Sequence, residues 1–193
     1  MNSVAVYCGA SSGFNDIYTH LAQDMGRTLA ERGITLVYGG GRVGLMGAVA
    51  DSALAHGGRV IGVIPDFLVA KEVEHRGVTE LHIVKSMHER KLLMADLAEG
   101  FVAMPGGFGT LEELFEVLTW GQLGLHRKPT GVLNVQGYYD HLLRALDHMT
   151  TEGLLRVENR NQLLSSPSPA ALLDHMLAYE PVQVEKWLTP PTT

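Results

Sequence analysis

Short apolar runs alternate along the whole chain with segments whose apolar residues recur at helical spacing. The runs at 4–8 and 60–64 are apolar at almost every position, which is typical of strands that are covered on both faces. The segment at 15–32 instead carries an apolar residue at every fourth position from Ile17 to Leu29, as one face of an α-helix does. This alternation predicts an α/β fold with a parallel sheet and helices on both of its faces.

The same pattern sets the expected elements and the extent of the domain. Residues 66–79 lack a clear period, so we expect an irregular loop there. We expect a single domain over residues 1–180 and a flexible tail over 181–193, which is rich in Pro and Thr. Strands are expected at 4–8, 35–38, 60–64, 81–84, 101–104 and 131–135 and from Leu163, and helices at 15–32, 44–56, 87–99, 110–123, 138–152 and 169–179.

Composition and charge exclude several classes of protein. Of 193 residues, 46% are hydrophobic and 19% are charged, as in an ordinary globular protein. The net charge of −6 argues against a general nucleic-acid-binding surface. The single cysteine, Cys8, rules out an intrachain disulfide and a Cys-based zinc site. Without a signal peptide or an apolar run of roughly 20 residues, we expect a cytoplasmic protein that holds no metal and contacts no membrane.

The strongest chemical signal is Pro-Gly-Gly-Phe-Gly-Thr-Leu-Glu-Glu at 105–113. It lies between an expected strand and an expected helix, where unpaired N–H groups and the helix dipole favour an anion. Thr110 and Glu113 have the spacing of a capping box. Tight glycine turns and capping boxes also occur for structural reasons alone, but three glycines, a threonine and paired carboxylates in nine residues favour a phosphate cradle.

A second glycine cluster spans 39–47. Gly39, Gly41 and Gly44 satisfy the G-x-G-x-x-G pattern of dinucleotide-binding proteins between a strand and a helix. The pattern is weak because such turns also arise for packing, and it follows the second expected strand rather than the first. Binding of a nucleotide-like phosphate or ribose is therefore favoured over binding of a nicotinamide dinucleotide.

The third signal is a pair of cations, Arg90 and Lys91, on the helix expected at 87–99. At 100° per residue, Arg90 falls inside the apolar arc of this helix and Lys91 on its shoulder. Burying an isolated cation is costly, so a buried Arg normally faces an anion. Arg90 either binds a phosphate or a catalytic carboxylate, or it pairs with a structural carboxylate or reaches the surface.

Taken together, the segments 39–47, 87–91 and 105–113 resemble the Lonely Guy family of cytokinin-activating phosphoribohydrolases, whose members are also labelled lysine decarboxylases. The signature Pro-Gly-Gly-x-Gly-Thr-x-x-Glu is matched at every fixed position, with Phe108 at the variable one. The resemblance implies a Rossmann-like, doubly wound fold, a homodimer and no cofactor. It also implies cleavage of the N-glycosidic bond of adenosine 5′-monophosphates, with or without an N6 substituent, to free base and ribose 5-phosphate.

The resemblance further assigns roles to residues of this chain. Arg90 and Glu113 match the catalytic pair: a carboxylate would stabilise an oxocarbenium-like ribose, and Arg90 would orient Glu113 and keep it ionised or hold the substrate. Whether Glu113 attacks C1′ or activates water stays open. The expected substrate-binding residues are Gly40, Gly41, Glu72, Lys91, Gly106, Gly107, Phe108, Gly109, Thr110, Leu111, Glu112 and Thr119.

Two alternatives to the hydrolase remain. One is a nucleotide-binding module without turnover, because one fold serves many functions. The other is a dinucleotide-dependent oxidoreductase that rests on the second glycine cluster. The presence of both Arg90 and Glu113 favours the enzyme over the passive binder, which has no need of such a pair.

Overall fold

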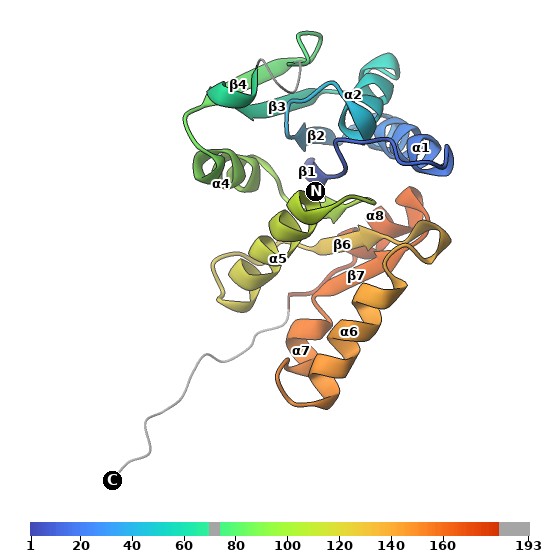
Figure 1. The fold of residues 1–193 in the computed structure, drawn as a ribbon, viewed down its shortest axis with the longest axis vertical. Helices are drawn as coiled ribbons and strands as arrows, with labels where there is room; N and C mark the ends of the chain where they lie inside the picture. Colours follow the sequence, from blue (N-terminus) through green and yellow to red (C-terminus); the bar gives the residue numbers. More distant parts are fainter. Residues whose placement is uncertain (70–73, 182–193) are drawn as a thin grey trace.

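The computed structural model describes residues 1–69 and 74–181, which form one seven-stranded sheet (Figure 1). The expected tail therefore lies outside the described residues from 182 onward. The order of the strands is β4-β3-β2-β1-β5-β6-β7, and each neighbouring pair is parallel. The strands are β1 (Ser3–Tyr7), β2 (Thr35–Tyr38), β3 (Val60–Pro65), β4 (Glu80–Val84), β5 (Phe101–Ala103), β6 (Thr130–Leu133) and β7 (Leu163–Ser166).

The strand order reverses direction between β1 and β5. The chain first proceeds outward from β1 to β4, then returns to add β5, β6 and β7 on the other side of β1. Crossover connections between parallel strands are right-handed. Connections that proceed in opposite directions along the sheet therefore place their helices on opposite faces, and the helices form two layers (Figure 1). This doubly wound, Rossmann-like arrangement confirms the predicted fold class.

Each layer of helices covers its own part of the core. Leu36 and Tyr38 of β2 lie under α1 (Ile17–Glu31), α2 (Gly44–Ala55) and α8 (Pro169–Leu177). On the opposite face, Tyr7 and Phe101 lie under α4 (Met87–Leu97) and α5 (Phe108–Gln122). Leu146 of α6 (Asp140–Thr151) extends this second layer over β6 and β7. Burial of each such side chain contributes about 1.5–3 kcal/mol.

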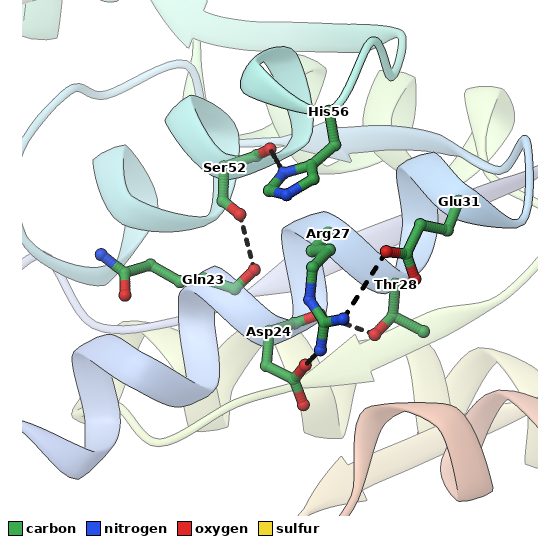
Figure 2. Close-up of polar contacts among 7 residues, drawn as sticks. All are labelled: Gln23, Asp24, Arg27, Thr28, Glu31, Ser52 and His56. Atoms are coloured by element: carbon green, nitrogen blue, oxygen red, sulfur yellow. Dashed lines mark hydrogen bonds and ion pairs between the residues drawn. The ribbon is translucent and has the colours of Figure 1, made fainter.

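Helices α1 and α2 pack closely because a glycine lies at their crossing. A Cβ atom on Gly26 would lie 2.3 Å from the carbonyl oxygen of Val49. The Ser52 hydroxyl of α2 donates to the Gln23 carbonyl of α1 at 2.6 Å (Figure 2). Arg27 pairs with Asp24 and Glu31 on the exposed side of α1, where ion pairs contribute little. The close contact thus depends on backbone approach rather than on surface charge.

The start of α5 differs from the expected one. The helix begins at Phe108 with Gly107 as its N-cap and no side-chain cap, so the prediction that Thr110 caps it is wrong. Thr110 lies inside the first turn and is 3% exposed, packed under Gly106. A side-chain cap is present at α4 instead: Ser86 Oγ accepts from Glu89 N at 3.1 Å, and Glu89 Oε2 accepts from Lys85 N, one residue before the cap, at 2.8 Å.

Three short helical elements were not expected from the sequence. They are α3 (Asp66–Val69), the 3-10 helix η1 (Val135–Gly137) and α7 (Val157–Arg160). Each is four residues long or shorter, so none carries the repeated apolar spacing by which a helix is recognised. In the segment expected to be irregular, α3 is followed by residues 70–73, which lie outside the described residues.

Candidate active site

The carboxyl ends of β1 and β5 meet where the strand order reverses, which is where ligands bind in sheets of this kind. Two hydrogen bonds join the loops there: Gly9 N donates to Pro105 O at 3.1 Å, and Leu45 N donates to Gly9 O at 3.1 Å. A cavity of about 420 Å³ opens between them. Its lining residues are Gly9, Ala10, Ser11, Ser12, Gly13, Tyr18, Leu45, Pro105, Gly106, Gly107 and Tyr138.

Backbone N–H groups at the start of α5 are available to an anion. Within the described residues, the amides of Gly106 to Thr110 donate to no protein acceptor, and Leu111 N, which donates to Gly107 O at 3.1 Å, is the first that does. The positive end of the helix dipole lies at the same place. Consecutive unpaired amides at a helix start form a site for phosphate.

The geometry of Gly107 and Gly109 also points to a ligand. A Cβ atom on either would meet nothing within 4 Å, and Gly107 has an ordinary φ of −95°. Neither backbone strain nor a protein neighbour therefore requires glycine at these positions. Phe108 between them is 94% exposed. Glycine here leaves room for a molecule that approaches the backbone closely.

Arg90 is held by backbone carbonyls at the ends of two strands. It is 6% exposed, as the helical spacing predicted. Its Nε donates to Val63 O at 3.1 Å, and its Nη2 donates to Gly39 O at 2.9 Å. A Cβ atom on Gly39 would lie 1.9 Å from Nη2. Glycine at position 39 is therefore needed to seat the guanidinium group.

The charges of Arg90 and Glu113 act on one buried group, the thiol of Cys8 at the end of β1. Burial raises the pKa of Cys8 far above its ordinary value, the charge of Glu113 raises it further, and that of Arg90 lowers it. Both charges therefore lie within electrostatic range of the same strand end. The structure thus places both residues expected to form the catalytic pair near the carboxyl end of β1.

Lys91 and Glu112, both expected to contact substrate, contact each other. Lys91 is 8% exposed, and its Nζ donates to Glu112 Oε1 at 2.5 Å and to Glu116 Oε1 at 3.1 Å. Burial by itself lowers the pKa of Lys91, but its hydrogen bonds to the two carboxylates outweigh burial and raise the pKa above the ordinary value. Lys91 therefore stays protonated and joins α4 to α5 through two ion pairs.

The other expected binding residues lie in several places. Gly40 O accepts from His75 N at 3.1 Å, and Gly41 pairs with Glu74 in an isolated bridge. Leu111 packs on the core under α5 and α6. Glu72 lies outside the described residues.

Thr119 lies apart from the glycine turn. Its hydroxyl donates to Phe115 O at 2.7 Å, near the far end of α5. It lines a separate hollow of about 80 Å³ together with residues of α6 and α7. Within one copy of the described chain, Thr119 is not brought to the cavity at β1 and β5.

Sequence reasoning missed several residues of the cavity. Ser11 and Ser12 follow the first strand in Gly-Ala-Ser-Ser-Gly; the sequence places this loop at the ligand-binding edge of the sheet but assigns neither serine a role. Tyr18 and Tyr138 come from α1 and from the loop before α6. No local pattern brings these two rings together, because their contact depends on the fold.

Protein packing explains several glycines of the second cluster. Gly39 makes room for Arg90, and a Cβ atom on Gly44 would lie 2.3 Å from the carbonyl carbon of Ala10. A Cβ atom on Gly47 would lie 2.0 Å from Arg42 O. These contacts account for Gly39, Gly44 and Gly47 without a dinucleotide. Protein packing therefore explains two of the three glycines of the G-x-G-x-x-G pattern, which weakens the pattern as a sign of an oxidoreductase.

Over residues 1–69 and 74–181, no three His, Cys, Asp or Glu side chains are grouped so that they could hold a metal ion. No helix in that part of the chain has the length and apolar character needed to cross a membrane.

Comparison with known proteins identifies relatives over most of the chain. A family model described as "Possible lysine decarboxylase" matches residues 46–176. The cytokinin riboside 5′-monophosphate phosphoribohydrolase of Rhodococcoides fascians is 51% identical over 163 residues, which cover 84% of this chain and 82% of the relative. An Arabidopsis thaliana protein of the same name is 49% identical, with 92% of this chain and 82% of the relative covered.

Solved structures of lower identity share the fold. The molybdenum cofactor binding protein of Rippkaea orientalis superposes with a TM-score of 0.68 at 21% identity, over 91% of this chain and 95% of that one. DNA processing protein A of Helicobacter pylori gives 0.57 at 16% identity, over 91% and 80%. At such identities the likeness concerns the fold alone. On the evidence of the closely similar sequences, the chain belongs to the cytokinin riboside 5′-monophosphate phosphoribohydrolase family, the Lonely Guy family that its motifs resemble.

Proposed function

We propose that this protein hydrolyses the N-glycosidic bond of adenosine 5′-monophosphates, including N6-substituted ones, to the free base and ribose 5-phosphate. The names of relatives near 50% identity support this reaction. The observation that carries the proposal is the pairing of two features at one sheet edge. Buried Arg90 and partly buried Glu113 both lie within electrostatic range of Cys8 at the end of β1, and the unpaired amides of α5 begin at the neighbouring strand β5.

The chemistry follows from this arrangement. The amides of 106–110 would bind the 5′-phosphate and so hold the ribose over the start of α5. As the bond from C1′ to the base nitrogen breaks, positive charge develops on the ribose, and the Glu113 carboxylate would stabilise it. Water then adds to C1′ as a hydroxyl group and releases one proton. The departing base takes up one proton, so the reaction releases none overall. Arg90, fixed by Val63 O and Gly39 O, would orient Glu113 or the substrate.

The evidence for a role in substrate binding differs among the remaining residues. Gly106, Gly107, Phe108, Gly109 and Thr110 belong to the phosphate turn, while Leu111 supports it from the core side. Gly40 and Gly41 would line the site beside Arg90, and Glu72 is proposed from the family resemblance alone. Lys91 and Glu112 are hydrogen-bonded to each other, and Lys91 also binds Glu116, so we infer that they chiefly hold α5 in place.

We further propose a homodimer and a single domain over residues 1–180. Exposed apolar side chains on α4 and α5, Leu92 and Phe115, support a contact between copies. Such a contact is one way in which Thr119, remote from the cavity of its own chain, would meet a substrate. The single continuous sheet supports one domain, and a nucleotide substrate supports a cytoplasmic location. Light scattering on a size-exclusion column tests the dimer; a monomer mass contradicts it.

A lysine decarboxylase, as the description of the family model suggests, is poorly supported. That chemistry uses pyridoxal phosphate bound to a lysine as a Schiff base, which requires an uncharged amine. Lys91 has a raised pKa and hydrogen bonds to two carboxylates. It therefore does not fit the role of a Schiff-base lysine.

The experiment is a turnover assay with the wild-type protein. Adenosine monophosphate and its N6-isopentenyl form are incubated with the protein, and ribose 5-phosphate and free base are measured. The proposal predicts equal amounts of both products from at least one substrate. Binding without product would favour the passive nucleotide module, and tight binding of a nicotinamide dinucleotide in a parallel titration would favour the oxidoreductase.

A further inference from the structure

Two adjacent tyrosines reach from the loop between β6 and α6 to the glycine turn. The Tyr139 hydroxyl donates to Met104 O at 2.6 Å, and the Tyr138 hydroxyl donates to Gly106 O at 2.7 Å. The two carbonyls that flank Pro105 are thus both held by this loop. Tyr138 also lines the 420 Å³ cavity and packs edge-on against Tyr18, with ring centroids 5.6 Å apart.

The loop that carries these tyrosines has a specially fixed backbone. Gln136 has a φ of +52° and is the one non-glycine residue with positive φ in the described part of the chain. Gly137 follows with a φ of +68°. Asn134 then fixes the exit of the loop, because its Oδ1 accepts from Tyr139 N at 2.7 Å and its Nδ2 donates to Asp140 at 2.8 Å. Such a costly conformation persists where surrounding contacts determine it, often beside a functional site.

Tyr138 donates its hydrogen bond to the carbonyl of the peptide between Gly106 and Gly107. The Gly106–Gly107 peptide has no Cβ on either side, so no side chain of its own opposes rotation of the peptide. In a trans peptide the C=O and the following N–H point in opposite directions. While Tyr138 holds the Gly106 carbonyl, the Gly107 N–H points away from it, and that N–H donates to no acceptor among the described residues.

We propose that Tyr138 is a positioning residue for the substrate phosphate. Its hydroxyl keeps the Gly106–Gly107 peptide in the orientation that offers an N–H to the phosphate. A rotated peptide would instead present a carbonyl oxygen, which repels a phosphate. This inference rests on the proposed function, because it assigns the phosphate of that substrate to the glycine turn.

Tyr139 provides a matched control within the same loop. Its hydroxyl makes an equally short hydrogen bond, and its side chain is buried. The peptide that it holds, Met104–Pro105, has no N–H, because proline lacks one. Loss of the Tyr139 hydroxyl should therefore lower stability without altering the set of amides that face a phosphate.

The test compares Tyr138→Phe with Tyr139→Phe. Ribose 5-phosphate binding is measured by titration calorimetry, the KM and kcat for adenosine monophosphate by product release, and stability by thermal unfolding. For Tyr138→Phe we expect ribose 5-phosphate affinity to fall about tenfold and KM to rise about tenfold, the scale of one lost hydrogen bond near a charged group. The kcat should change less than about threefold, because the phosphate contact is made in ground and transition states alike.

For Tyr139→Phe we expect a lower melting temperature with an affinity for ribose 5-phosphate within about twofold of wild type. Unchanged affinity in Tyr138→Phe, or equal losses in both variants, would overturn the proposal. Calorimetry needs no turnover, so it tests Tyr138 even if the proposed hydrolysis fails. If ribose 5-phosphate binds to the wild type and to Tyr139→Phe but more weakly to Tyr138→Phe, the role of Tyr138 is supported. Wild type that does not bind ribose 5-phosphate overturns it.

Discussion

Gly39 and Arg90 are fitted to each other across two elements of the fold. The Gly39 carbonyl accepts a 2.9 Å hydrogen bond from Arg90 Nη2, and a Cβ atom at position 39 would lie only 1.9 Å from the same nitrogen. A glycine that resembles part of a nucleotide-binding pattern thus serves to seat a buried cation. This relationship makes position 39 a direct probe of how Arg90 is placed.

Gly39→Ala should displace the Arg90 guanidinium. Forcing a methyl group into this contact costs about 1–3 kcal/mol of unfolding free energy. A catalytic group moved by about 1 Å loses on the order of 100-fold in rate, so we expect a fall of that size in kcat/KM. Denaturant unfolding and product release measure the two effects. Wild-type kcat/KM in a folded Gly39→Ala protein would show that Arg90 is not positioned by this contact.

Gly109→Ala should separate stability from binding. Position 109 lies in the first turn of α5, and an added Cβ meets no protein atom within 4 Å. Alanine favours the helix by up to about 1 kcal/mol over glycine, so the melting temperature should rise or stay constant. The methyl group should nevertheless raise the KM for adenosine monophosphate at least about fivefold, because it blocks close approach to the amides. An unchanged KM places the phosphate elsewhere.

The unfolding free energy should fall in mild acid because of His126. Its Nε2 donates to Val117 O at 2.8 Å while its Nδ1 accepts from Lys128 N at 3.1 Å, an arrangement that needs the neutral ring. Burial lowers the pKa of His126, Lys128 lowers it further, and the bond to Val117 opposes them. The unfolded chain therefore takes up a proton first, near pH 6.5. Stability is complete above that pH and is lost as pH falls through the lowered pKa.

Denaturant unfolding between pH 5 and pH 8 measures this dependence. His126→Gln should be less stable at pH 8 and should lose less stability than wild type on acidification. The exposed His88 provides the control, and His88→Gln should follow the wild-type curve. Parallel curves for wild type and His126→Gln would assign the acid sensitivity to another group.

The ion pair of Lys91 with Glu116 on α5 should give a measurable coupling free energy between the two residues. Lys91 Nζ lies 3.1 Å from Glu116 Oε1 and is almost fully buried, while Glu116 is only partly exposed. Lys91→Met, Glu116→Met and the double variant form a thermodynamic cycle. We expect a coupling of about 1 kcal/mol, larger than for an exposed pair. A coupling near zero would mean that the bridge does not hold α5.

Local pattern predicted much of the fold. The bounds of β2 and the positions of the other strands follow from apolar runs, which in β1, β2, β3, β5 and β6 are almost completely buried. The burial of Arg90 follows from its place on the helical arc. The N-cap of α5 was misplaced by three residues, because Thr110 has the spacing of a cap but packs under Gly106, and Gly107 is the N-cap. Spacing alone does not distinguish these two uses of a threonine.

The candidate site depended more on contacts distant in sequence. Gly39 meets Arg90 across 51 positions, and Tyr138 meets Gly106 across 32. Such pairs are set by the order of strands in the sheet, which no local period encodes. Thr119 shows the converse: it lies on the same helix as the glycine turn yet lines a different hollow.

The proposed catalytic role of Glu113 is tested by measuring how much ribose 5-phosphate the Glu113→Gln variant releases from adenosine monophosphate. The control is Glu116→Gln, one turn along α5, whose amide oxygen still accepts a hydrogen bond from Lys91. We predict that Glu113→Gln lowers kcat at least about 100-fold, the scale of a lost catalytic group, while Glu116→Gln stays within about threefold of wild type. A Glu113→Gln protein with wild-type kcat would contradict the account.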